Sequence, residues 1–413
     1  MSDPPTRAAC HRLADWVLAE GQRRADLSRL IESFAETANR LGLPLWRLQY
    51  AVQTLHPLDF AQRWQWRQGA GMVHSRRARS DVTLPEFTNS PIARAFEGAG
   101  EMRRKLEGPD PPRDFPVLAD LIAEGATDYL VLPVTFSNRQ TNAITFASRR
   151  KGGFSEDDIE ALRLGAKALA PLFEIHAVRE LAGTLVDTYI GRQAGRRVLS
   201  GAITRGAGES LRAVVWYCDL RGFTALSNAL GRDGLLAALG GYFEAMGGAL
   251  EAHGGEVLKF IGDAMLGIVP LPPDCDLAGC TANALAGAFD ALDRMAALNR
   301  TRLARGEPAL HYGLALHVGE VMYGNIGAPN RLDFTVIGPA VNLASRIENL
   351  AARLGRPLVV SAEFARSSGR AMDSLGRYEF KGIPGEHEIY VPRREHLPAP
   401  PPSATPTPAT VDA

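Results

Sequence analysis

The sequence has no net charge, little cysteine and no long apolar run. Its 46 basic and 46 acidic residues cancel, so no overall field attracts a nucleic acid or an anionic membrane. Its four cysteines show neither a disulfide framework nor a CxxC pair, which argues against a secreted, disulfide-bonded fold. No apolar run reaches the length of a membrane span, and the first residues lack the pattern of a signal peptide. We therefore expect a cytoplasmic protein that binds no membrane and no nucleic acid.

Lysine is also scarce, although arginine is common. The lysines are those at positions 105, 151, 167, 259 and 381. Where arginine is the usual cation, a lysine at a candidate site suggests that a compact point charge is needed there. This makes Lys259 and Lys381, each in a predicted strand, candidate site residues.

Length and composition predict two domains, because 413 residues exceed one ordinary domain and 46% of them are apolar. We predict a regulatory domain over residues 1–154, a connecting helix and linker over 155–208, and a second domain over 209–393. The proline-rich segment 394–413 is typical of a disordered tail.

The first predicted domain begins with helices and continues with a mixed pattern. Residues 1–60 have a helical character, most clearly in the amphipathic stretch from about 14 to 41. Residues 128–136 and 141–147 indicate two strands that are joined by a polar turn.

A long helix is predicted to follow these strands. Ser155 and Asp158 stand at the two positions of a capping box, and an apolar stripe continues from there towards Tyr189. We expect Pro171 to kink or break this helix. The stripe suits a connecting helix that pairs with its twin in a dimer, and it suits equally a helix packed on its own domain.

Strands alternate with helices from residue 211 onward, which predicts a sheet with helices on one face. The expected strands are 211–218, 256–260, 264–269, 310–318, 332–337 and 357–361. The expected helices are 222–252, 278–304 and 339–354.

Two aspartates carry most of the functional signal. Asp219 ends an apolar strand and opens Asp-Leu-Arg-Gly-Phe-Thr, the pattern of a turn that leads into a helix. Asp263 follows Gly262 at the tip of a predicted hairpin. If the two strands are neighbours, both carboxylates meet at one end of the sheet. Two hard oxygen ligands beside the N–H groups of a helix start suit Mg²⁺ carrying a phosphate chain.

Further motifs accompany the aspartates in a fixed order. They are the glycine-rich segment 319–327, the segment 331–348 with Asn342 and Arg346 on one helical face, and Phe380-Lys381-Gly382. Together, from about residue 211 to 391, these motifs resemble the catalytic domain of the class III nucleotidyl cyclases. The resemblance implies an α+β fold with a ferredoxin-like βαββαβ core, active as a head-to-tail homodimer whose sites are shared between the two subunits.

The resemblance also implies a role for each matching position. Asp219 and Asp263 match the family's metal-binding aspartates for two Mg²⁺ or Mn²⁺ ions, with the Leu220 carbonyl as a further ligand. The positions that match substrate-binding and catalytic residues are Phe223 and Thr224 at the phosphates, Lys381 at the polyphosphate, and Asn342 and Arg346 from the opposite subunit, at the ribose and the reacting phosphorus. The implied reaction is in-line attack of the ribose 3′-hydroxyl on the α-phosphorus, which expels pyrophosphate.

The choice of base follows from hydrogen-bond chemistry. Lys259 has only donors, so it suits the N1 acceptor of adenine and would face the N–H of guanine. Thr335 matches the family's second base-reading position, where an acceptor can take the N6 amino proton. We therefore expect ATP as the substrate and an adenylate cyclase as the function. The Lys–Thr pairing resembles a bacterial subgroup often described as bicarbonate-responsive.

Two other functions stay open from the sequence. A guanylate cyclase is one, although an acidic residue would be expected there in place of Lys259. A catalytically silent cyclase-like regulator is the other, although both aspartates and the Asn342–Arg346 pair are present.

The first half more weakly resembles a GAF-like sensor module, through the hairpin after residue 128 and the helix that follows it. This resemblance implies a regulatory role and a small-molecule ligand of unknown identity. Trp64 and Trp66 are candidates to line its cavity, but alternating aromatics are also typical of a half-buried strand.

Overall fold

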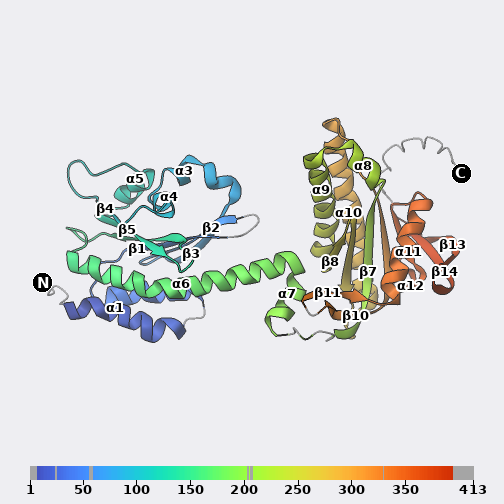
Figure 1. Ribbon diagram of the computed structural model, residues 1–413, viewed down its shortest axis with the longest axis horizontal. Coiled ribbons are helices and arrows are strands. Elements are labelled where there is room, and N and C mark those ends of the chain that lie inside the picture. Colours follow the sequence, from blue (N-terminus) through green and yellow to red (C-terminus); the bar gives the residue numbers. More distant parts are fainter. Residues whose placement is uncertain are drawn as a thin grey trace. The chain divides into compact units, whose positions relative to one another are not determined.

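The computed structural model describes residues 7–23, 26–54, 59–201, 204, 208–328 and 330–393 (Figure 1). The predicted tail, residues 394–413, lies outside this part of the chain. The chain divides into two compact units, Met1–Leu185 and Val186–Ala413. None of the helices in the described ranges combines the length and the apolar character that crossing a membrane requires.

A six-stranded antiparallel sheet forms the centre of the first unit, in the order β3-β2-β1-β6-β5-β4. Its strands are β1 (Arg47–Gln53), β2 (Asp59–Arg67), β3 (Gly71–Ala78), β4 (Met102–Lys105), β5 (Asp128–Thr135) and β6 (Thr141–Ser148). The hairpin expected after residue 128 is therefore present as β5 and β6. The helical interpretation of residues 1–60 is wrong from Arg47 onward, because β1 alternates apolar and polar residues with a period of two.

Helices cover both faces of this sheet, as Figure 1 shows. One face packs on α1 (Arg7–Glu20), α2 (Leu27–Arg40) and the first half of α6 (Glu156–Ile190). The other carries the short elements η2 (Arg79–Thr83), α3 (Pro85–Thr88), α4 (Pro91–Phe96) and α5 (Pro116–Ala123). Trp64 and Trp66 are buried in the core on the α1, α2 and α6 face. They are strand residues of that core and do not line the cavity on the other face.

The predicted long helix is α6. Its start has the expected capping box, since Ser155 Oγ accepts from the Asp158 N–H at 3.1 Å and Asp158 Oδ2 accepts from the Ser155 N–H at 2.8 Å. The helix continues through Pro171, so the break that the proline suggested is absent. Its first half packs into the core of the first unit, whereas Val178 and Leu185 beyond it are exposed.

The second unit is built on an eight-stranded sheet. Seven strands follow the order β13-β14-β12-β10-β7-β9-β8, and β11 pairs with β10. The strands are β7 (Gly208–Arg221), β8 (Glu256–Ile261), β9 (Ala264–Pro270), β10 (His311–Ala328), β11 (Arg331–Ile337), β12 (Leu358–Ser361), β13 (Met372–Phe380) and β14 (Ile383–Pro392). The helices are α7 (Arg192–Leu199), α8 (Phe223–Ala229), α9 (Arg232–Ala252), α10 (Leu277–Ala304), α11 (Pro339–Arg353) and α12 (Ala362–Ser368).

The central part of this unit has the predicted ferredoxin-like order. Strands β7, β8, β9 and β10 alternate with α9 and α10 as βαββαβ, and they lie in the antiparallel order β10-β7-β9-β8. Helices α9 and α10 pack on one face through the core around Trp216. Helix α11 covers the opposite face through Leu343, Ala344 and Ile347. The expectation of helices on a single face is therefore wrong, because α11 buries an apolar stripe of its own.

Candidate functional site

Two carboxylates meet at one end of the second sheet. The pairing of β7 with β9 reaches Cys218 and Met265, so Asp219 lies one residue beyond it on β7. Asp263 stands in the two-residue turn between β8 and β9, where Gly262 takes a φ of 65° that glycine adopts without strain. Because β7 and β9 are neighbours, this turn places Asp263 beside Asp219. The convergence expected from the sequence is thus present.

The two carboxylates repel each other. The pKa of Asp219 is raised to about 6, first by burial and then by the charge of Asp263. Asp219 Oδ1 is buried and has no hydrogen-bond partner. Such a pair is relieved by a divalent cation, so these residues fit Mg²⁺ or Mn²⁺. Over the described ranges no cluster of three or more His, Cys, Asp or Glu side chains could hold a metal ion, so the protein offers an open pair here.

The chain turns sharply just after Asp219. Leu220 is 5% exposed and its side chain packs into the core, which fixes the backbone next to the aspartate. Gly222 takes a left-handed φ of 69° before α8 begins at Phe223. Phe223 is half-buried against the same core, and Thr224 is exposed. The predicted strand, turn and helix are therefore present around the carboxylate.

A buried glutamate that the sequence analysis missed lies behind Asp219. Glu348 on α11 is 2% exposed, and burial and the charge of Asp219 raise its pKa to about 7, against the opposing effect of Arg221. Gly313 is the partner of Asp219 in the β7–β10 pairing. A Cβ atom there would lie 2.2 Å from Glu348 Oε1 and 2.7 Å from Arg221 Nη2. The absence of a side chain at Gly313 makes room for the Glu348 carboxyl group and the Arg221 guanidinium.

A pattern in the sequence could have revealed Glu348. The residues of α11 that are buried recur at helical spacing, at Ala340, Leu343, Ala344, Ile347, Glu348 and Ala351. A carboxylate inside an apolar stripe is unusual, because burying an unpaired charge is costly. It therefore signals a partner in the interior.

Lys259 and Thr335 line one cavity of about 630 Å³ in the second unit. Lys259 Nζ donates to Asp333 Oδ2 at 2.5 Å, and this bond lowers the pKa of Asp333. Thr335 is 8% exposed and follows Asp333 by two residues on β11. Phe243 and Phe260 also line the cavity. The two predicted base-reading residues therefore lie together in a hollow with aromatic walls.

Asp333 was not among the predicted site residues. Its signal is the period of two in β11, which places side chains at 333 and 335 on the same face while Phe334 and Val336 enter the core. The side chain two positions before Thr335, which is Asp333, was therefore a candidate to contact Lys259.

The remaining predicted residues lie on the surface. Asn342 and Arg346 are exposed on the outer side of α11, and Lys381 is exposed in the turn between β13 and β14. No ion pair involves Arg346 or Lys381 within the part of the chain that the structure describes. The nearby charges that shift the pKa of Asp219 come from Asp263 and Arg221. A single chain therefore presents the carboxylate pair and these cations as separate features.

Comparison with known proteins finds a family match for most of the second unit. Residues 209–392 match the model of the family described as the adenylate and guanylate cyclase catalytic domain. The chain is 32% identical over 163 residues to an adenylate cyclase of Anabaena cylindrica. This alignment covers 39% of this chain and 32% of that protein. It is 31% identical over 238 residues to an uncharacterized protein of Mycobacterium tuberculosis. That alignment covers 54% of this chain and 40% of the relative. The chain thus spans less than half the length of these relatives.

One solved structure is similar to part of this chain. The adenylyl cyclase CyaB from P. aeruginosa is 26% identical, with a TM-score of 0.42, over 46% of this chain and 98% of that one. Over residues 209–392 the second unit is thus similar to the adenylate and guanylate cyclase catalytic domain.

Proposed function

We propose that this chain is an adenylate cyclase, which converts ATP to 3′,5′-cyclic AMP and pyrophosphate. The observation that carries the proposal is the pair Asp219 and Asp263, whose mutual repulsion and unpaired buried oxygen suit a divalent cation. The cyclase domain match over residues 209–392 supplies the reaction class. The cavity with Lys259 and Thr335 supplies a place for the base.

Asp219, Asp263 and the Leu220 carbonyl would hold two Mg²⁺ or Mn²⁺ ions together with the triphosphate. Ions held there would lower the pKa of the ribose 3′-hydroxyl and neutralise charge on the phosphates. The open carboxylate pair fits this arrangement, because substrate oxygens then complete the ligand set. Phe223 and Thr224 begin the helix after the turn, where backbone N–H groups face outward and can hold a phosphate.

The active form in this proposal is a homodimer with two composite sites. Asn342 and Arg346 are exposed and four residues apart on one side of α11, so they are available to a second chain. Arg346 would stabilise the charge on the reacting phosphorus, and Asn342 would orient the ribose. Lys381, exposed in its turn, would reach the polyphosphate. Arg346 has no ion-pair partner among the residues that the structure describes, and such a guanidinium suits a role at a shared site.

Adenine is the proposed base because Lys259 can only donate. Its ammonium would donate to adenine N1, while the Thr335 hydroxyl would accept from the N6 amino group. Asp333 holds the Lys259 ammonium at 2.5 Å and so fixes the direction in which it is offered. The first unit would act as a regulatory domain that adjusts this activity.

The test is nucleotide turnover by the purified full chain, given ATP or GTP with Mg²⁺ or Mn²⁺. Cyclic product would be identified by mass spectrometry. Cyclic AMP from ATP, lost in Asp263→Ala and kept in Asp274→Ala, is the expected result. Asp274 is an exposed aspartate in the segment before α10, which makes it a matched control. Cyclic GMP as the main product would contradict the assignment of adenine as the base. A folded dimer that makes no cyclic product would favour a silent regulator.

A further inference from the structure

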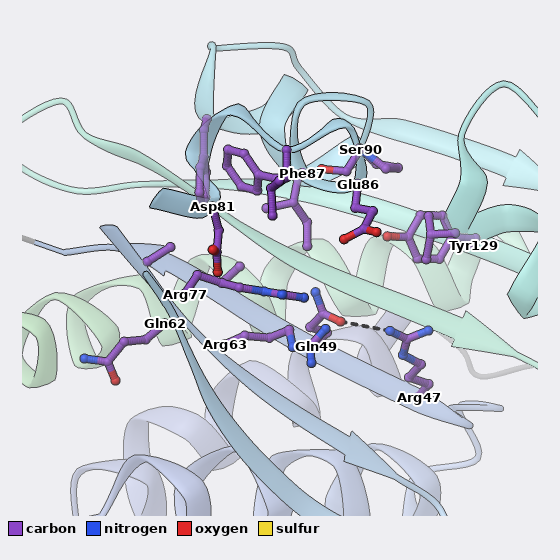
Figure 2. A pocket seen from close by; sticks show the side chains of 17 residues that line it. Arg47, Gln49, Gln62, Arg63, Arg77, Asp81, Glu86, Phe87, Ser90 and Tyr129 are labelled. Atoms are coloured by element: carbon purple, nitrogen blue, oxygen red, sulfur yellow. Dashed lines mark hydrogen bonds between the residues drawn. The ribbon is translucent and has the colours of Figure 1, made fainter. Parts of the chain in front are cut away.

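A cavity of about 140 Å³ lies in the first unit, between the sheet and the segment of η2, α3 and α4 (Figure 2). It takes no part in the proposed reaction, because it belongs to the Met1–Leu185 unit. The volume is close to that of an engineered cavity, about 150 Å³, that holds one benzene molecule. A ligand with a body of about one ring therefore fits it.

The sheet side of this cavity is cationic. Arg47 from β1, Arg63 from β2 and Arg77 from β3 all line it, as Figure 2 shows. Arg63 pairs with Ala51 on β1 and Ser75 on β3, so the three guanidinium groups come from adjacent strands. Burial lowers the pKa of Arg63, and the charges of Arg77 and Arg67 lower it further. Like charges on one sheet face repel each other, which is costly without an anion among them.

Arg47 is the most buried of the three, at 8% exposed. Its Nη2 donates to Gln49 Oε1 at 2.9 Å and to Gln65 Oε1 at 2.8 Å, both of which are neutral acceptors. Its Nε is buried and has no hydrogen-bond partner. In the described part of the chain no ion pair involves Arg47, Arg63 or Arg77. A buried guanidinium with a free donor and no ion pair in the described ranges is an unusual arrangement, since buried charges are normally paired.

The opposite wall of the cavity is mainly apolar. Phe87 from α3 lies over the cavity in Figure 2. The cavity is also lined from the helical side by Leu84, which precedes α3, by Ile92 and Phe96 of α4, and by Val117 of α5. Phe87 stacks edge-on against Phe60, with ring centroids 4.7 Å apart. The cavity thus has one cationic wall and one apolar wall, which is the environment of an amphipathic ligand.

Two acidic residues limit the charge of that ligand. Asp81 and Glu86 also line the cavity, and neither forms an ion pair with the three arginines in the described ranges. Their carboxylates add negative potential around the cationic wall, so a ligand with two or more charges is repelled more strongly than one with a single charge. A single carboxylate also matches the planar fork of a guanidinium in two hydrogen bonds.

We propose that this cavity binds a small organic monocarboxylate with an aromatic or short aliphatic body, and that Arg63 and Arg77 hold its carboxylate. The apolar body lies against Phe87 and its neighbours. Binding lowers the repulsion among the guanidinium groups and fills the space under α3. None of the residues of η2 or α3 is buried, so the ligand supplies an apolar surface on which this segment packs.

The test is calorimetric titration of the full chain with benzoate, phenylacetate and butyrate, each paired with its neutral amide. At least one carboxylate is expected to bind with at least tenfold higher affinity than its own amide. Arg63→Gln and Arg77→Gln are each expected to weaken that binding by at least tenfold. Two variants are used because Arg63 also donates to Ser75 Oγ at 3.2 Å, whereas Arg77 is exposed and its replacement leaves the fold intact.

Arg76→Gln is the matched control, because Arg76 neighbours Arg77 in β3 but faces the other side, 3.8 Å from Asp59. This variant is expected to bind the carboxylate as the unchanged chain does. Equal affinity for carboxylate and amide would overturn the proposal, as would full binding by both the Arg63 and the Arg77 variants. Failure of all three carboxylates to bind would overturn it as well. The readout is binding and not turnover, so the result stands apart from the test of cyclase activity.

Discussion

The Lys259 ammonium lies 2.5 Å from the Asp333 carboxylate, across strands β8 and β11. Both side chains are about half exposed, with relative accessibilities of 42% and 44%. An ion pair so open to water contributes roughly 0.2–1 kcal/mol, which is too little to matter for folding. Its consequence lies in position, because it holds the cation that we assign to adenine N1.

Asp333→Asn is therefore expected to raise the KM for ATP about two- to fivefold, the factor that corresponds to an exposed pair. The kcat is expected to stay the same, because the bond acts on the base and not on the reacting phosphorus. Steady-state kinetics would show the change in KM without a change in kcat, and Asp274→Asn is the control. A lower KM would mean instead that Asp333 competes with the base for Lys259.

Lys259→Gln tests the base assignment directly. A glutamine amide can both donate and accept, so it faces N1 of adenine and the N–H of guanine equally well. The ratio of kcat/KM for ATP to that for GTP is expected to fall at least tenfold, the size of a lost discriminating hydrogen bond. Lys381→Gln is the matched control, because a phosphate contact serves both nucleotides and its loss leaves the ratio unchanged. A ratio unaffected by Lys259→Gln would contradict the assignment.

Local patterns predicted the carboxylate site well. The turn at Gly262 and Asp263, the strand that carries Asp219, and the capping box at Ser155 each depend on residues close together in the sequence. The period of two or of 3.6 then gives the strand or the helix without knowledge of the rest of the fold.

Features that depend on distant packing were missed. The expected strand 310–318 stops before the glycine-rich segment 319–327, but β10 continues through that segment to Ala328 and pairs with β7 as far as Gly324. Its glycines serve close approach, since a Cβ at Gly319 would lie 2.6 Å from the Ala340 side chain. The predicted helix 222–252 is two helices, because α8 ends at Ala229 and α9 begins at Arg232, after its N-cap Gly231.

The site partners Glu348 and Asp333 were missed for the same reason. Each contacts a residue that is far away in the sequence, on another element. Their patterns were visible, as a charge in an apolar helical stripe and a polar residue on the face of Thr335. Only the pairing of elements shows what they contact. The placement of Asn342, Arg346 and Lys381 opposite the aspartates of a second chain stays a prediction.

The raised pKa values predict how stability depends on pH. Asp219 and Glu348 keep their protons to about pH 6 and about pH 7 in the folded chain. Unfolded carboxyl groups lose theirs near about pH 4, so the folded state binds more protons between these values. The contribution of these two carboxyl groups to the free energy of unfolding therefore falls as the pH rises from about 4 to about 7. Calorimetric unfolding without divalent metal would show this fall, which is expected to be smaller in Asp263→Asn.

A divalent metal is expected to oppose this loss of stability. It binds the ionised carboxylates, so its stabilising effect grows from about pH 5 to about pH 8. Mn²⁺ at about 100 times its dissociation constant would add about 2.7 kcal/mol, or roughly 5–10 °C in the unfolding temperature of the second unit. Asp263→Asn is expected to remove this shift, and Asp274→Asn to keep it. An equal metal effect in both variants would place the ion elsewhere.

Gly313→Ala tests the packing of Glu348 and Arg221 behind Asp219. The new Cβ would lie 2.2 Å from Glu348 Oε1, so Glu348 and Arg221 must move. Such overpacking costs about 1–3 kcal/mol of stability, and we expect kcat to fall about tenfold while the preference for ATP is unchanged. Gly240→Ala is the control, because nothing lies within 4 Å of its Cβ position and alanine favours helix α9. Unchanged kcat in a destabilised Gly313→Ala chain would show that the packing of Glu348 and Arg221 serves folding alone.

Mixing two inactive variants tests the shared sites of the proposed dimer. Asp219→Ala and Arg346→Ala should each abolish activity alone, since every site then lacks one essential group. In a mixed dimer, one site takes Asp219 from one chain and Arg346 from the other and is complete, while the second site lacks both. Random pairing of equal amounts makes half of the dimers mixed, so about a quarter of the original activity should return.

The dimers would be formed from chains with two different affinity tags and purified through both, so that mixed pairing is proven before turnover is measured. The control is Asp219→Ala mixed with Asp263→Ala, which should recover nothing, because both changes fall on the same half of the site. Recovery in the first mixture and none in the second follows only if the aspartates and Arg346 come from opposite chains. Silence in both mixtures, from folded and demonstrably mixed dimers, would place all three residues in the site of a single chain.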